Sequence, residues 1–95
     1  MNVLVTGAFG NIGFSTVEEL LARGHAVRCF DVPTRANLRA ASRLGGKAEV
    51  VWGDLREPSE VRRAVQGMEA VIHLAFLIPK LSATGIDCED QPDLA

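Results

Sequence analysis

The sequence predicts an α/β protein built on a doubly wound parallel sheet. Short apolar runs rich in β-branched residues alternate with segments whose apolar residues recur at helical spacing, and glycine or proline ends most of these segments. Strands that alternate with helices form a parallel sheet with right-handed crossovers. We therefore expect an incomplete sheet of about four strands in the order 3-2-1-4, with its ligand crevice between the first and fourth strands at their carboxyl ends.

Each predicted element has a local signal. The run Val3-Leu4-Val5 stops at Gly7 and predicts a central strand over 2–6, buried on both faces. The other predicted strands lie at 26–30, 48–52 and 70–75, and the predicted helices lie at 11–23, 35–44 and 57–66. The side chains expected to face the core from the three helices are Ile12, Phe14, Val17, Leu20 and Leu21, then Leu38, Ala41 and Leu44, then Val61, Ala64 and Val65.

Composition limits the partners of the chain. Its 95 residues are 47% apolar and carry a net charge of −2, which indicates one small globular core and no basic surface for nucleic acid or anionic lipid. The apolar stretch over 70–79 is too short to span a bilayer, and the start lacks a signal-peptide pattern. We expect a cytoplasmic protein with no membrane partner. Cys29 and Cys88 lie far apart and indicate neither a disulfide framework nor a metal site.

A glycine-rich turn joins the first strand to the first helix. Gly7 allows a tight turn, Gly10 allows the backbone to approach a pyrophosphate, and Gly13 allows the helix to pack closely. The start of the helix offers free N–H groups and a positive dipole end to phosphates. The turn therefore predicts a dinucleotide site, and a glycine turn required only for packing is the alternative. Its candidate cofactor-binding residues are Gly7, Phe9, Gly10, Asn11, Ile12 and Gly13.

Asp31 is the second candidate group of this site. It ends the second strand eighteen residues after Gly13, where a carboxylate accepts hydrogen bonds from the adenosine ribose hydroxyls. Its negative charge would repel a 2′-phosphate, so the sequence favours NAD over NADP. Arg35 is a nearby group that could bind such a phosphate, and a solvated loop acid is the plain alternative for Asp31.

Together these motifs resemble the extended short-chain dehydrogenase/reductase family of NAD-dependent epimerases and dehydratases, many of which act on nucleotide sugars. The resemblance covers about residues 1–78 and implies a Rossmann-like NAD(P)-binding region there, with 79–95 as a loop or the start of a continuation. The segments that carry it are Thr-Gly-x-x-Gly-x-x-Gly from Thr6, Asp31, Gly53-Asp54-Leu55, and Val71-Ile72-His73-Leu74-Ala75.

The resemblance also implies roles for residues at the ends of the third and fourth strands. Asp54 and Leu55 would border the adenine ring, with the Asp54 carboxylate accepting from the exocyclic amine; a turn or helix-capping acid is the alternative. Leu74, Ala75 and Phe76 would run along the cofactor near the nicotinamide ribose. Phe76 departs from the family, which usually has a small residue there.

The catalytic group of that family has no counterpart in this sequence. The family uses a Tyr-x-x-x-Lys pair with a nearby serine or threonine, and this sequence contains no tyrosine. We therefore assign no catalytic or metal-binding residue, and we expect a small-molecule substrate only if a C-terminal part exists. His73, between Ile72 and Leu74, is interpreted as a core histidine with one nitrogen satisfied.

The end of the predicted sheet leaves two questions open. No strand-like segment follows Ala75, so Val71, Ile72 and Leu74 should lie at an exposed apolar edge. Either the chain is the N-terminal part of a longer protein, or two copies form a homodimer along this edge. Two functions also stay open: the NAD-binding region of an epimerase/dehydratase-like oxidoreductase that is inactive alone, or a non-catalytic dinucleotide-binding regulator or structural module.

Overall fold

The structure is a computed structural model that describes residues 1–75 of the chain. The expectations for Phe76, for Cys88 and for the loop at 79–95 concern residues outside this range. Within residues 1–75, no helix combines the length and the apolar character that crossing a membrane requires.

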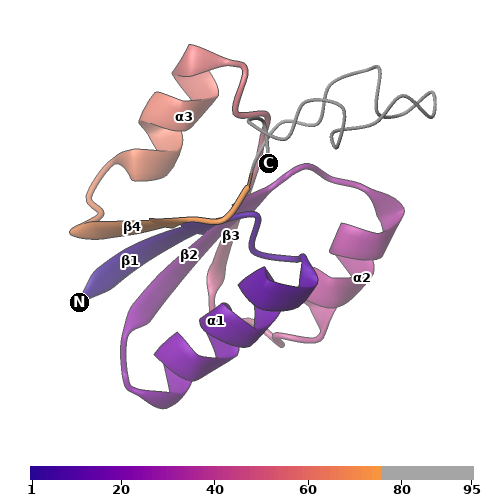
Figure 1. The fold of residues 1–95 in the computed structure, drawn as a ribbon, viewed down its shortest axis with the longest axis vertical. Helices are drawn as coiled ribbons and strands as arrows, with labels where there is room; N and C mark the ends of the chain where they lie inside the picture. Colours follow the sequence, from indigo (N-terminus) through magenta and orange to yellow (C-terminus); the bar gives the residue numbers. More distant parts are fainter. Residues whose placement is uncertain (76–95) are drawn as a thin grey trace, which may run out of the picture.

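Strands and helices alternate through the described residues in the predicted order. The four strands are all parallel and lie in the order β3-β2-β1-β4, which confirms the predicted fold class and topology (Figure 1). The elements are β1 (Asn2–Thr6), α1 (Asn11–Ala22), β2 (Ala26–Asp31), α2 (Arg35–Ser42), β3 (Glu49–Trp52), α3 (Pro58–Val65) and β4 (Ala70–His73).

Two layers of helices cover the sheet. Helices α1 and α2 lie on one face and α3 lies on the other (Figure 1). Because successive side chains of a strand point to opposite faces, Val3 and Val5 of β1 join the core beneath α1 and α2, whereas Leu4 joins Phe30 beneath α3. Strand β1 is buried from Val3 to Thr6, as expected of a central strand.

The three helices begin in different ways. Gly10 is the N-cap of α1 and offers no side-chain cap, whereas Thr34 caps α2 by accepting a hydrogen bond from the Asn37 N–H at 3.1 Å. Helix α3 has Pro58 in its first turn, where the missing N–H costs no hydrogen bond. The uncapped start of α1 therefore differs from that of α2 in leaving its first-turn N–H groups without a side-chain partner.

Three helical side chains expected to face the core are exposed instead. Ile12 is 72% exposed because it lies in the first turn of α1, beyond the end of β1. Leu38 is 49% exposed because α2 packs through Ala40, and residues two apart lie on nearly opposite sides of a helix. Val65 is 39% exposed at the last residue of α3, one position from the buried Ala64.

Strand β4 differs from the prediction in length and burial. It ends at His73 instead of Ala75, and the expectation that His73 is a core residue is wrong, because its side chain is exposed. Within the described sheet β4 pairs with β1 alone, so its side chains on the α3 face lack cover on one side. Val71 is 50% exposed as expected, while Ile72 and Leu74 are partly buried against the core of the other face.

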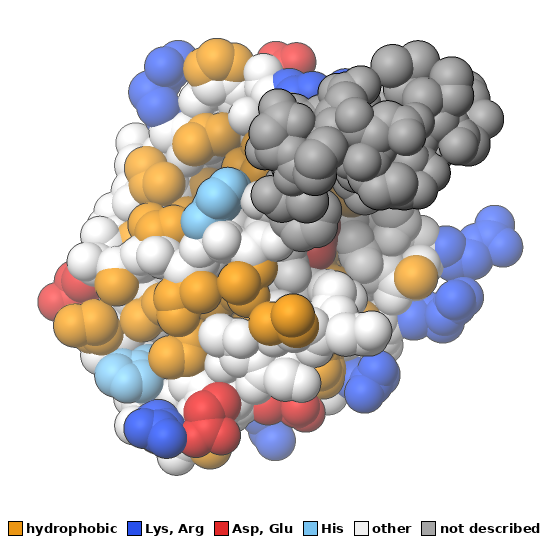
Figure 2. All heavy atoms as spheres, viewed as in Figure 1, with side chains coloured by type: hydrophobic (Ala, Val, Ile, Leu, Met, Phe, Trp, Pro, Cys, Tyr) orange, Lys and Arg blue, Asp and Glu red, His pale blue; other side chains and the backbone are white. Residues whose placement is uncertain are grey.

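Hydrophobic side chains gather on one face of the molecule. Figure 2 shows them around the region where β4 and the start of α1 lie, with charged groups mainly toward the rim. Ile12 and Val71 are the large apolar residues of these two elements that are most exposed.

Candidate functional site

The glycine-rich turn is a compact connection from β1 to α1. Gly7 has a left-handed φ of +67°, and its N–H donates to the Phe30 carbonyl at 3.0 Å, which ties the turn to β2. A Cβ on Gly7 would come within 2.8 Å of the Ala75 nitrogen, so the chain after β4 also requires glycine here. The tight turn predicted from the sequence is therefore confirmed at Gly7.

Gly13 and Gly10 differ in why they are glycine. A Cβ on Gly13 would overlap the carbonyl oxygen of Gly7, so the close packing at this position is against the turn itself. Gly10 has an ordinary φ of −77° and is exposed, and a Cβ there would find only the Gly7 oxygen, at 3.7 Å. Packing within the chain requires glycine at 7 and 13 but does not require it at 10.

The start of α1 presents hydrogen-bond donors at this turn. The Phe14 N–H donates to the Gly10 carbonyl at 2.8 Å and closes the first helical bond, so the N–H groups of Asn11 and Ile12 precede the helical bonding pattern. Both residues are exposed, and the first turn holds no acidic side chain. Free N–H groups and the positive end of the helix dipole make this position suitable for an anion.

Asp31 lies at the end of β2 with its carboxylate held against the turn. Its Oδ2 accepts the Phe9 N–H at 3.0 Å, and its Oδ1 accepts the Val32 N–H at 2.8 Å. Each carboxylate oxygen can accept a further hydrogen bond, so the group is fixed in place and still able to bind a hydroxyl. The Phe9 ring packs on Trp52 with a centroid distance of 5.3 Å.

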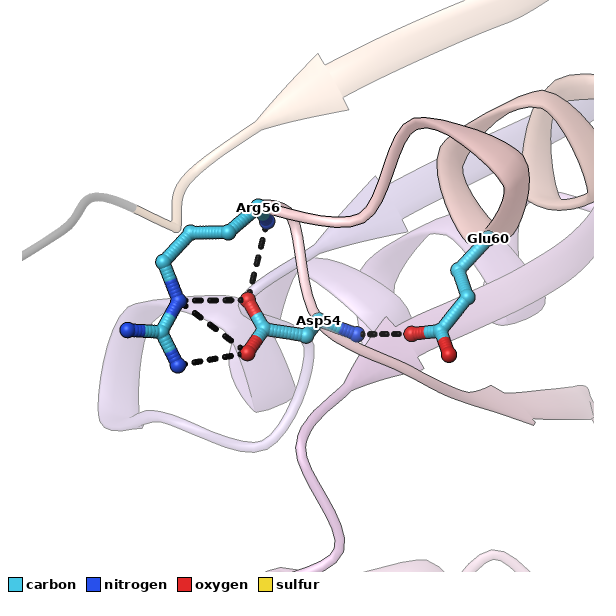
Figure 3. Close-up of polar contacts among 3 residues, drawn as sticks. All are labelled: Asp54, Arg56 and Glu60. Atoms are coloured by element: carbon cyan, nitrogen blue, oxygen red, sulfur yellow. Dashed lines mark hydrogen bonds and ion pairs between the residues drawn. The ribbon is translucent and has the colours of Figure 1, made fainter.

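Asp54 lies just after β3 and is held at both its main chain and its side chain (Figure 3). The Arg56 guanidinium donates to both carboxylate oxygens, with the shortest contact 2.7 Å long, and the Arg56 N–H donates to Oδ1 at 2.8 Å. These hydrogen bonds lower the pKa of Asp54 to about 2. The Asp54 N–H donates to Oε1 of Glu60 at 2.7 Å.

A cavity of about 130 Å³ brings the predicted residues of three strand ends together. It is lined by Phe30, Asp31, Val32, Gly53, Asp54, Leu55 and Ala75. A larger hollow of about 780 Å³ lies along the outer side of α1 and contains Asn11 and Ile12, but none of the strand-end residues. The smaller cavity is therefore the one that joins the candidate ribose and adenine groups.

Thr6 organises the end of β4. Its Oγ1 accepts the N–H groups of Leu74 at 3.1 Å and of Ala75 at 3.3 Å. The same hydroxyl lies 2.7 Å from Nδ1 of His73, so one nitrogen of His73 is satisfied, as predicted. Because the two lone pairs of the Thr6 hydroxyl oxygen already accept these N–H groups, the hydroxyl donates its proton to Nδ1 of His73. Thr6 thus holds Leu74 and Ala75 beside Gly7.

Sequence reasoning missed three contributors to this arrangement. Arg56 and Glu60 both hold Asp54, and the main chain of Phe9 holds Asp31. Of these three, only Glu60 has a signal in the sequence. It lies two residues after Pro58, in the first turn of a helix, where an acidic side chain can accept hydrogen bonds from nearby backbone N–H groups. Nothing in the sequence alone indicates that Phe9 and Asp31 meet.

Comparisons with known proteins point to one family. The model of the NAD dependent epimerase/dehydratase family matches residues 3–90. A UDP-glucose 4-epimerase from Klebsiella pneumoniae is 42% identical over 83 residues, which are 81% of this chain and 60% of that protein. Sterol demethylase protein B from Methylococcus capsulatus is 40% identical over 78 residues, which are 82% of this chain and 23% of that protein.

A solved structure agrees with these sequence relatives. The UDP-glucose 4-epimerase of Thermus thermophilus in complex with NAD has a TM-score of 0.68 and 34% identity, over 94% of this chain and 29% of that chain. The present chain spans less than two thirds of each of these three proteins.

Proposed function

The chain belongs to the NAD dependent epimerase/dehydratase family, and on this premise we propose that it binds NAD at the carboxyl ends of its strands, as the cofactor-binding region of an epimerase/dehydratase-like oxidoreductase. Gly10 carries the proposal. It is an exposed glycine with room for a side chain, at the start of a helix whose first N–H groups are free. A ligand that approaches the backbone explains a glycine that internal packing does not require.

In this proposal the turn between β1 and α1 holds the pyrophosphate. The N–H groups of Asn11 and Ile12 and the positive end of α1 supply hydrogen bonds and charge complementarity. Gly7 and Gly13 keep the turn compact enough for these groups to converge, and the buried Phe9 ring of the turn packs on Trp52.

The adenosine half lies in the cavity at the ends of β2 and β3. Asp31 accepts from the ribose hydroxyls, while Asp54 and Leu55 border the adenine. Leu74 and Ala75 lead toward the nicotinamide ribose, and the same role is proposed for Phe76, which lies outside the described residues. Bound NAD would supply hydride transfer, and the residues named here bind and orient it.

Calorimetry with NAD and a Gly10→Val variant tests the proposal. A valine side chain at this position occupies the place of the pyrophosphate, so we expect the affinity for NAD to fall by at least about tenfold, which corresponds to about 1.4 kcal/mol. Ser15→Val introduces the same side chain elsewhere on the exposed surface of α1 and should bind like the wild type. Equal affinities of wild type and Gly10→Val, or no binding by the wild type, would contradict the proposal.

Cofactor choice is tested at Asp31. Its carboxylate, fixed by Phe9 and Val32, would repel the 2′-phosphate of NADP, so the wild type should bind NAD more tightly than NADP. Asp31→Ala should narrow that difference by weakening NAD and relieving the repulsion of NADP. A wild type that prefers NADP would reject this part of the proposal.

A further inference from the structure

The turn that carries Asp54 and Leu55 is fixed by a side chain from the following helix. Glu60, in the first turn of α3, reaches back so that its Oε1 accepts the Asp54 N–H at 2.7 Å (Figure 3). The Asp54 carboxylate points the other way, toward Arg56. One residue of the candidate site is thus held from two sides, through its main-chain N–H and through its carboxylate.

The Glu60 contact is not required for capping α3. An acid at the third helical position usually accepts the N–H of the N-cap residue. Here the N-cap is Glu57, and its N–H donates to the Asp54 carbonyl at 3.0 Å. Glu60 is therefore free of that task and instead binds a main-chain group six residues before it, outside the helix.

The residues around this contact fit closely. A Cβ on Gly53 would lie 3.0 Å from Oε1 of Glu60 and 2.8 Å from Cε1 of Phe30. Glycine at 53 thus leaves space next to the turn for both the Glu60 carboxylate and the Phe30 ring. The Gly53 N–H donates to the Asp31 carbonyl at 3.0 Å, so the same turn is also tied to the strand that carries the ribose-side acid.

We propose that Glu60 is a positioning residue for the adenine end of the cofactor site: by accepting the Asp54 N–H, it fixes the turn so that Asp54 and Leu55 line the cavity beside Asp31. This inference rests on the proposed NAD site. Without Glu60 the Asp54 N–H donates to water, and the segment at 53–55 has to become ordered when the adenine binds. That ordering cost reduces affinity without any lost contact between Glu60 and the ligand.

Calorimetry tests the inference with two ligands, NAD and nicotinamide mononucleotide, which lacks the adenosine. The variants are Glu60→Ala and Glu60→Gln, with Glu57→Ala as the control. Glu60→Ala should weaken NAD roughly five- to tenfold and leave the mononucleotide unchanged. Glu60→Gln should recover most of the affinity, because its amide oxygen can accept the same N–H. Glu57 makes no side-chain cap bond, so Glu57→Ala should behave like the wild type.

Two results would overturn the inference while leaving the proposed function in place: unchanged NAD affinity in Glu60→Ala, or an equal loss for NAD and the mononucleotide. A wild type that fails to bind NAD would instead reject the proposed function and this inference with it. Should Glu60→Ala unfold, Glu60→Met keeps the length of the side chain and removes its carboxylate, and the same outcomes apply.

Discussion

At the residue scale, the two carboxylates of the candidate site are held by different partners. Asp31 accepts two main-chain N–H groups, whereas Asp54 is bound mainly by the Arg56 guanidinium. Main-chain donors keep Asp31 in place as long as β2 and the turn are folded. The Asp54–Arg56 pair is formed by a side chain that is 70% exposed, so it depends on charge and is weakened by salt.

The Asp54 pair predicts a shift that can be measured directly. Arg56→Ala should raise the pKa of Asp54 from about 2 toward its ordinary value of 3.8, because the guanidinium hydrogen bonds that favour the carboxylate are lost while the main-chain N–H of residue 56 still donates to it. The stabilisation from this lowered pKa is complete above the unfolded value of 3.8 and disappears as the pH falls through about 2. Carboxyl-carbon NMR across this pH range measures the pKa, and an unchanged value in the variant would refute the assignment.

Single residues also show how far the sequence could predict the site. The glycine spacing predicted Gly7 and Gly13 because the positive φ of Gly7 and the contact of Gly13 with the Gly7 oxygen arise within one short turn, whereas the contact of Gly7 with Ala75 does not. The contact of Phe9 with Asp31 was not predictable, because it joins segments whose relative placement is set by strand register. Glu60 carried only the signal of an acid in a first helical turn, which does not identify the Asp54 N–H as its partner. Asp54 was identified by family resemblance, and its pairing with Arg56 depends on a side-chain conformation that no spacing rule specifies.

At the scale of elements, the helix starts divide into capped and open ones. Thr34 closes α2 through its hydrogen bond to the Asn37 N–H, while the start of α1 at Gly10 is left without a side-chain cap. Helix α3 also lacks a side-chain cap at Glu57, and of these two starts the proposed function uses that of α1. A helix end that lacks its own cap leaves donors for a ligand, at some cost in stability to the free protein.

The Thr34 cap gives a prediction for α2. Thr34→Ala removes the acceptor of the Asn37 N–H and should lower the free energy of unfolding by about 1 kcal/mol, whereas Thr34→Ser should keep most of it. Urea unfolding followed by circular dichroism measures the difference. If alanine and serine variants were equally stable, the cap would contribute nothing and the assignment would be wrong.

The predicted elements were most accurate where glycine or a buried run fixed their ends. The first strand matches at both ends, because Val3 to Thr6 is buried and Gly7 turns the chain. Strand β4 ended earlier than predicted, because apolar composition alone continued to Ala75 while the chain already turns toward Thr6 and Gly7. The Leu74 N–H is shared between the main-chain oxygen and the hydroxyl of Thr6, and the Ala75 N–H donates to that hydroxyl, so the regular strand pairing ends here although the residues are still apolar.

At the scale of the whole molecule, the strand order brings the site together. With β1 between β2 and β4, the glycine turn, Asp31 and Ala75 meet at one end of the sheet. The alternation of strands and helices made this order predictable, since the parallel topology permits few arrangements. The same sheet buries Cys29 completely in the core beneath α1 and α2.

The reactivity of Cys29 reports on the opening of the whole sheet. Burial, with a smaller contribution from the charge of Asp31, raises the pKa of the thiol to about 12, so it stays protonated and unreactive at neutral pH. The Cys88→Ser variant leaves Cys29 as the only thiol. Its reaction with a thiol reagent should require unfolding. The rate of that reaction should therefore match the rate of unfolding measured by the fluorescence of Trp52, the single tryptophan. Fast labelling of the native protein, with Trp52 fluorescence unchanged, would show that the core opens locally.

In the proposed complex NAD lies across the strand ends, with its pyrophosphate on the glycine turn. Amide NMR spectra of the protein titrated with NAD test it most directly, because each amide near the ligand shifts separately. We expect saturable shifts for the glycine turn at residues 7–13, for Asp31 and Val32, and for the turn at 53–55. Shifts confined to the outer hollow of α1 around Ser15 and Arg23, or no saturable shift at all, would contradict it.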